Sequence, residues 1–172
     1  MASRFNITGG LTQELIAPGN NARVSNIQLT NMSKPDVERD SIVDLYIEKK
    51  LTGKFYLLKR VKIPHSVTLT HEVRGFDNKP DEYGLYIKLH TSTTFTLTGS
   101  IDPAASTTVT GVGTKFLDEI NIGDELVVSG ETRRVSAIAS NTSLTVSVAF
   151  SNNSNDTSPD INPIAPVDII LF

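Results

Sequence analysis

The segment that decides the fold class is Ser41–Val61, which reads SIVDLYIEKKLTGKFYLLKRV. Its apolar residues Val43, Leu45 and Ile47 occupy alternate positions, with Asp44 between the first two. A period of two places alternate side chains on opposite faces of a strand. The centre of the segment is polar and contains glycine, a composition typical of a chain reversal. The segment therefore predicts an antiparallel β-hairpin with one face turned toward a core.

The same period recurs in the rest of residues 1–95. It predicts half-buried strands within residues 23–31, 67–73 and 85–89. Helical spacing is almost absent, and only Phe116–Ile120 places apolar side chains on one side of a single helical turn. The sequence therefore predicts an all-β protein with an antiparallel β-sandwich.

A second β-rich pattern occupies residues 96–160. It contains five short β segments separated by Gly, Asn and Asp: Thr94–Thr98, Thr107–Thr110, Glu125–Val128, Thr132–Ala137 and Ser143–Val148. We interpret this pattern as a small β-barrel or β-sandwich. Within it, Gly111–Lys115 lacks the spacing of a phosphate-binding loop and predicts a tight turn that leads Phe116 into a core.

The final segment, Val167–Phe172, is too apolar for a free tail. A nearly continuous apolar run is typical of a strand buried on both faces, so we expect this strand to return to the first module. Residues 1–95 plus 161–172 then form an outer sandwich, and residues 96–160 an insertion in one of its loops. Two tandem domains are the alternative.

Charge differs between these parts. Residues 1–95 carry 13 Lys/Arg against 10 Asp/Glu, whereas residues 96–160 carry 3 against 8. The whole 172-residue chain has a net charge of −3, which argues against a general nucleic-acid coat. It has no cysteine, which excludes disulfides and thiolate metal sites. No apolar run approaches the roughly 18 residues of a membrane span, and we expect a soluble protein.

Catalytic motifs are not found. There is no GxSxG or HExxH pattern, and His90 alternates with the apolar residues of its predicted strand, so we interpret it as a surface or interface residue. Asp36, Glu38 and Asp40 could attract a cation, but Arg39 lies among them, and we interpret this cluster as a solvated loop. The sequence thus predicts no enzyme activity, no cofactor and no metal.

Basic residues gather around the predicted hairpin. They are Lys49, Lys50, Lys54, Lys59, Arg60 and Lys62. Phe55 and Tyr56 are interleaved with them, a combination that could stack nucleic-acid bases but also occurs on ordinary half-exposed strands. Without a recognisable nucleic-acid-binding motif, we predict that this cluster contacts a negatively charged protein partner.

Several segments of the second pattern occur in a distinctive order. They are Ser106–Phe116 with Gly-Thr-Lys-Phe, Ile122–Val128 with Gly-Asp-Glu-Leu, Arg134–Ile138, and Thr142–Val146 with Ser-Leu-Thr-Val. This order resembles a small β module of structural and tail-associated proteins of tailed bacteriophages, over about residues 100–150. The outer segments Arg23–Asn31, Ser41–Lys50, Tyr83–Leu89 and Val167–Leu171 resemble β-sandwich virion proteins more loosely. The resemblance implies no catalytic residues.

The leading hypothesis is a non-enzymatic phage structural protein, a capsid decoration or cement protein present in many copies. Neck, tail, baseplate or fibre-adaptor positions are alternatives, and so is a carbohydrate-binding β module, although the four Tyr are dispersed along the chain and there is no Trp. The hypothesis implies other virion proteins, such as major capsid or tail proteins, as partners, with a homo-oligomer or multi-copy assembly and no membrane. It also implies virion localisation after synthesis in the host cytoplasm.

Overall fold

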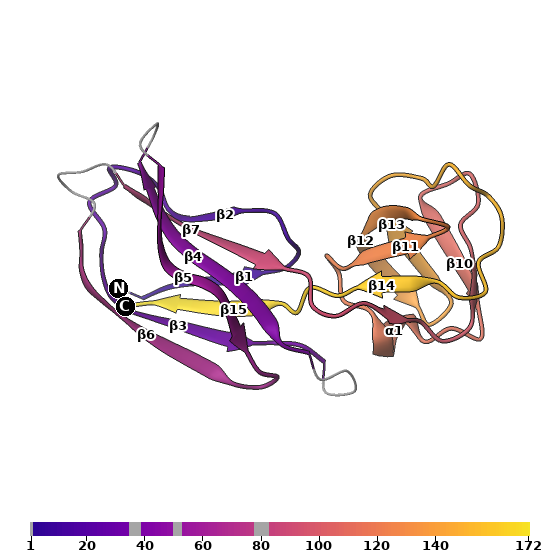
Figure 1. Ribbon diagram of the computed structural model, residues 1–172, viewed down its shortest axis with the longest axis horizontal. Helices are drawn as coiled ribbons and strands as arrows, with labels where there is room; N and C mark the ends of the chain where they lie inside the picture. Colours follow the sequence, from indigo (N-terminus) through magenta and orange to yellow (C-terminus); the bar gives the residue numbers. More distant parts are fainter. Residues whose placement is uncertain (1, 35–38, 50–52, 78–82) are drawn as a thin grey trace.

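The computed structural model describes residues 2–34, 39–49, 53–77 and 83–172. The protein is all-β, and every strand pairing in these ranges is antiparallel. The strands form two four-stranded sheets and one seven-stranded sheet (Figure 1). The all-β class predicted from the alternating pattern is confirmed.

The two four-stranded sheets contain strands from both ends of the chain. The first has the order β1 (Ser3–Ile7), β15 (Val167–Leu171), β3 (Arg23–Asn31) and β6 (Thr68–Asp77). The second has the order β2 (Gln13–Ile16), β7 (Gly84–His90), β4 (Ser41–Lys49) and β5 (Gly53–Ile63). One apolar core takes side chains from both sheets, including Ile27 and Ile169 from the first and Leu45 and Leu85 from the second.

The predicted hairpin is confirmed in the described residues, where β4 pairs with β5 from Ser41↔Ile63 to Lys49↔Gly53. The return of the final segment is also confirmed, because β15 lies between β1 and β3. Its expected burial on both faces is wrong. Val167, Ile169 and Leu171 are buried, whereas Asp168 and Ile170 are half-buried on the outer face of a sheet that has a core on one side only.

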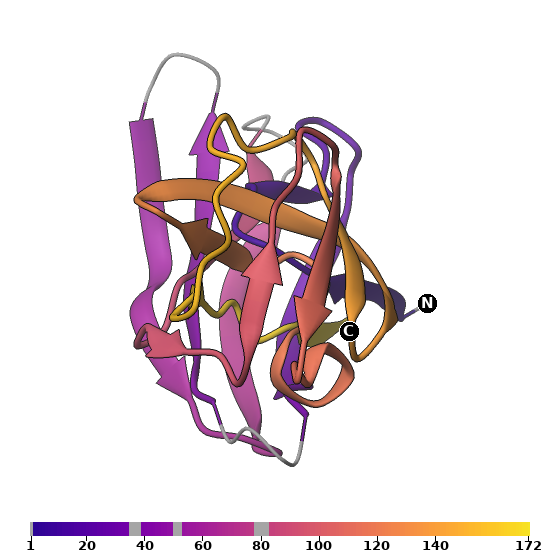
Figure 2. The same cartoon turned by 90° about the vertical axis from the view of Figure 1, so that its right-hand side faces the viewer.

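The seven-stranded sheet comes from the middle of the chain. Its order is β8 (Phe95–Thr96), β14 (Asp160–Asn162), β11 (Glu125–Val128), β12 (Glu131–Ser140), β13 (Ser143–Val146), β10 (Thr108–Val112) and β9 (Ser100–Asp102). It surrounds a second apolar core that contains Phe116, Leu126 and Leu144. The ribbon shows the strands of this sheet curling around a common centre (Figures 1 and 2).

The single predicted helical turn is confirmed as α1 (Phe116–Glu119), and Phe116 is fully buried as the tight turn before it predicts. The sequence does not reveal β9 and β14, which have three residues each, because such short segments carry little periodicity. The chain passes between the two cores twice, through residues 91–94 and 163–166 (Figure 1).

Candidate functional site

The structure places most of the predicted basic cluster on one hairpin. Lys49 ends β4, while Lys54, Lys59, Arg60 and Lys62 lie on β5. Lys50 falls outside the described residues. β5 contains no acidic residue, and it is an edge strand that pairs only with β4 in the part of the chain that is described.

Three lysines of this cluster lie over tyrosine rings. The Nζ atom of Lys54 is 4.5 Å from the ring centre of Tyr46 and donates a hydrogen bond to its hydroxyl at 3.3 Å. The Nζ atom of Lys59 is 4.9 Å from the ring centre of Tyr56. That of Lys49 is 5.9 Å from the ring centre of Tyr83, within the range of a cation–π contact. The hydrogen bond to Tyr46 raises the pKa of Lys54, which therefore stays charged at neutral pH.

The tyrosines form a row across the second sheet. Tyr86, Tyr46 and Tyr56 are register neighbours on β7, β4 and β5, and Glu14 on β2 extends the row. The ring centres of Tyr46 and Tyr86 are 5.7 Å apart and those of Tyr46 and Tyr56 are 5.5 Å apart. The Tyr86 hydroxyl donates to Glu14 at 3.2 Å.

A glycine gives one of these rings its position. A Cβ atom on Gly84 would lie 2.7 Å from the ring of Tyr86, so that ring lies over the glycine. Tyrosines dispersed in the sequence are thus collected on one face of the second sheet, where Tyr46, the middle ring, is only 2% exposed. A signal is present in the sequence for two of them, because Tyr46 and Tyr86 alternate with apolar residues that point into the core.

An irregularity in β5 brings the backbone of Arg60 into contact with Asp44 on the neighbouring strand. Arg60 has a φ of 53°, in the left-handed region, where the register of β4 and β5 shifts. Its backbone N–H donates to Asp44 Oδ1 at 2.7 Å, and His90 Nε2 donates to Asp44 Oδ2 at 2.8 Å. The interpretation of His90 as a surface residue is therefore incomplete, because it has a buried carboxylate partner.

The hydrogen bonds to Asp44 make stability depend on pH. Burial alone would raise the pKa of Asp44, but the hydrogen bonds from Arg60 and His90 outweigh it and lower the pKa. The carboxylate therefore stabilises the fold above the ordinary Asp pKa of about 3.9 and loses this effect as pH falls through its lowered pKa. We expect Asp44→Asn to reduce the free energy of unfolding at pH 7 by about 1–2 kcal/mol. Urea unfolding at pH 7 and pH 3 should show this difference shrinking in acid; an equal difference at both would contradict the assignment.

The ion pairs of the basic cluster are exposed. Lys62 Nζ is 3.7 Å from Asp40, and Lys54 Nζ is 4.0 Å from Glu48. Exposed pairs of this kind contribute little to stability. A partner carboxylate can therefore replace them at low cost.

A different set of residues joins the two cores. Arg39 is 5% exposed and pairs with Asp124, which is completely buried, at 3.1 Å. Arg39 also donates to the carbonyl of Glu119. The expectation that Arg39 belongs to a solvated loop is wrong, because its guanidinium reaches a carboxylate of the other core; Asp36 and Glu38 lie outside the described residues.

We call the contact between the two cores the joint, and Asp124 accepts three hydrogen bonds in it. It accepts hydrogen bonds from the backbone N–H groups of Asn121 at 2.9 Å and Ile164 at 2.7 Å, in addition to that from Arg39. Burial raises the pKa of Asp124. The three hydrogen-bond donors favour the charged carboxylate and so counteract part of this rise. The carboxylate thereby ties β11 and the loop before it to the returning chain at Ile164.

Two more contacts hold the cores together. Lys34 Nζ donates to the carbonyls of Leu117 and Ile120 at 2.5 and 2.6 Å, around the end of α1. A Cβ atom on Gly123, which has a φ of 100°, would lie 2.6 Å from the backbone nitrogen of Gly9. Only a residue without a side chain permits this close approach.

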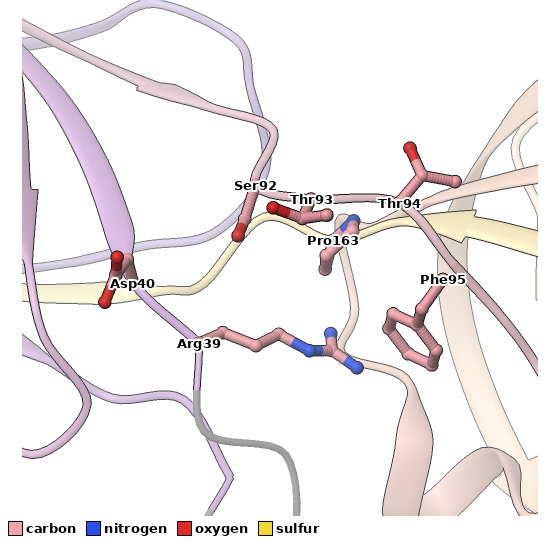
Figure 3. A pocket seen from close by; sticks show the side chains of 7 residues that line it. All are labelled: Arg39, Asp40, Ser92, Thr93, Thr94, Phe95 and Pro163. Atoms are coloured by element: carbon pink, nitrogen blue, oxygen red, sulfur yellow. The ribbon is translucent and has the colours of Figure 1, made fainter.

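A cavity of about 320 Å³ lies beside the joint (Figure 3). It is lined by Arg39, Asp40, Ser92, Thr93, Thr94, Phe95 and Pro163. The guanidinium carbon of Arg39 is 4.7 Å from the ring centre of Phe95, and its Nε is buried without a hydrogen-bond partner among the described residues. This lining mixes both charges with hydroxyl groups and selects no particular ligand chemistry.

Within the described ranges, no three His, Asp or Glu side chains are grouped so that they could hold a metal ion. The same part of the chain has no helix long and apolar enough to cross a membrane. No family model, curated protein or solved structure matches the chain.

Proposed function

We propose that this chain is a non-enzymatic structural protein of a tailed-bacteriophage virion, acting as a capsid decoration or cement protein. The observation that carries the proposal is the order of motifs in residues 106–146, which resembles a β module of such proteins. Neck, tail, baseplate and fibre-adaptor positions belong to the same class. The proposed partners are major capsid or tail proteins and further copies of the chain, with no cofactor.

The same proposal divides the chain into an outer β-sandwich, residues 1–95 plus 161–172, and an inserted β module, residues 96–160. Two observations support the division. The two apolar cores take their residues from separate parts of the chain, apart from the returning strand, and β8 pairs with β14 where the chain enters and leaves the second sheet. Phe95 and Ile161 pack in the second core, so the boundaries of the inserted module lie slightly outside residues 96–160. The outer sandwich would anchor the protein, and the acidic module would project.

Anchoring in this account uses the basic cluster of the β4–β5 hairpin. The described residues of the cluster are exposed or half-buried, and their own ion pairs are weak. Many identical copies on one particle convert modest individual contacts into strong attachment.

One observation favours a second candidate, a carbohydrate-binding module. Tyr46, Tyr56 and Tyr86 meet in one row, although they are dispersed in the sequence. Lys54 and Lys59 lie over two of these rings, which leaves less ring surface for a sugar. Binding of the isolated protein on a glycan array would favour this candidate over the structural one.

Charge reversal tests the anchor. We expect Lys54→Glu/Lys59→Glu to reduce incorporation into particles severalfold, because it changes the sign of the proposed contact while exposed charges alter folding by only about 0.5 kcal/mol. The matched control is Arg4→Glu/Lys115→Glu, which changes the same net charge at exposed positions elsewhere. Incorporation is measured as copies per purified particle. Equal copy numbers for both variants and the wild type would show that this hairpin is not the anchor.

A further inference from the structure

We propose that the cations along β5, two of which are held in place by tyrosine rings, form a docking line for an extended acidic segment of a partner protein. This inference rests on the proposed function, because it names the chemistry of the partner that the anchor takes. It assigns Tyr46 and Tyr56 as positioning residues, which act through Lys54 and Lys59.

The geometry of β5 gives the docking line its length. Lys54, Lys59 and Lys62 are exposed along one edge strand that has no acidic residue. Lys62 lies eight positions after Lys54, which is about 26 Å at about 3.3 Å per residue in a regular strand. The register shifts near Leu58 shorten this span slightly. An extended segment of about eight residues therefore matches the line.

The tyrosine rings organise the lysines before a partner binds. A free lysine side chain has many rotamers, and ordering it on binding costs conformational entropy. Lys54 is held by a ring and a hydroxyl of Tyr46, and Lys59 by the ring of Tyr56, so part of this ordering is already done. Removing the ring of Tyr56 should therefore weaken docking without changing any charge.

Apolar groups adjoin the cations. Tyr56 is 43% exposed and lies two positions from Lys54, on the same face of the strand. Phe55 is 53% exposed on the opposite face of the same edge strand. A partner segment lying along β5 can cover apolar surface as well as pair its carboxylates. The proposed partner is therefore acidic and partly apolar.

The observations favour an acidic protein segment over other anions. Asp44 and Glu48 lie on β4, the strand that pairs with β5, so the positive charge of this face is interrupted. A protein segment can place apolar residues opposite these carboxylates, whereas a nucleic-acid backbone carries a phosphate at every position. The ring faces of Tyr46 and Tyr56 are covered by lysines, which opposes base stacking. A second copy cannot pair its own β5 here, because like charges would face each other.

The test measures binding of a fluorescent decaglutamate peptide to the full chain by anisotropy. We expect binding that weakens as NaCl rises, since exposed charge contacts are screened. Lys54→Met/Lys59→Met should weaken it about tenfold or more, whereas the control Arg4→Met/Lys115→Met should stay close to wild type. Because all four positions are exposed, both variants should keep the wild-type melting temperature.

Two tyrosine variants separate positioning from charge. Tyr56→Leu should weaken decaglutamate binding severalfold with its net charge unchanged, and Tyr56→Phe, which keeps the ring, should bind like wild type. Equal binding by Tyr56→Leu and Tyr56→Phe would overturn the positioning role. Equal binding by the two lysine double variants would overturn the docking line.

Two further outcomes would also overturn the proposal: tighter binding of a dT12 oligonucleotide than of decaglutamate, or salt-sensitive self-association that Lys54→Met/Lys59→Met abolishes. The first identifies a nucleic acid as the ligand and the second identifies another copy. Because the peptide assay needs no particle, its failure is distinguishable from failure of the virion role, which particle incorporation measures.

Discussion

Asp124→Ala is expected to lower the free energy of unfolding by about 3–5 kcal/mol, because it leaves the buried guanidinium of Arg39 without its partner. The same change removes the acceptor of two backbone N–H groups, those of Asn121 and Ile164. Chemical denaturation of the full chain measures the loss.

An exposed pair provides the control for this prediction. Asp40→Ala removes the carboxylate that faces Lys62 at the surface, and we expect it to cost under about 1 kcal/mol. Replacing both members of the buried pair by apolar residues, Arg39→Met with Asp124→Leu, should recover part of the Asp124→Ala loss, since no lone buried charge remains. Similar losses for Asp124→Ala and Asp40→Ala would mean that the buried pair does not stabilise the joint.

Deleting residues 167–172 is expected to abolish cooperative unfolding of the two four-stranded sheets and the first apolar core between them. β15 is an interior strand, and its removal leaves β1 without its partner and uncovers one side of β3. It also removes three buried side chains from the first core: Val167, Ile169 and Leu171. Thermal unfolding followed by circular dichroism measures the effect.

A pair of point variants on β15 separates burial from strand pairing. Ile169→Ala empties a core position and should cost about 2–5 kcal/mol. Ile170→Ala lies on the half-exposed outer face and should cost under about 1.5 kcal/mol. An unchanged melting transition after the deletion would show that this strand is a binding arm and not a structural part of the sheet.

The sequence predicts well those elements whose faces differ in polarity. The β4–β5 hairpin could be predicted because alternating apolar residues and a polar turn are local signals, and the return of β15 because its apolar run is unsuited to a free tail. The extent of burial could not, since it depends on which sheet covers the second face. Ile170 is apolar yet half-exposed for that reason.

The sequence predicts which basic residues form the candidate site, but it does not predict which side chains they contact. The basic residues cluster in the sequence, but the ring of Tyr83 under Lys49 and the ring of Tyr86 stacked on Tyr46 come from a segment far along the chain. Arg39 and Asp124 are separated by 85 positions, and no local pattern identifies either as half of a buried pair. Sequence periodicity reports the face of one strand and not which distant residue lies opposite.

The location and copy number of this polypeptide in an intact particle test the central claim most directly. We predict that an electron cryo-microscopy reconstruction of purified virions will contain it at many symmetry-related positions, with β5 toward a neighbouring virion protein and residues 96–160 outward. Mass spectrometry of the same particles should give a matching stoichiometry. Absence of the chain from purified particles, while it accumulates in the infected-cell lysate, would contradict the structural role.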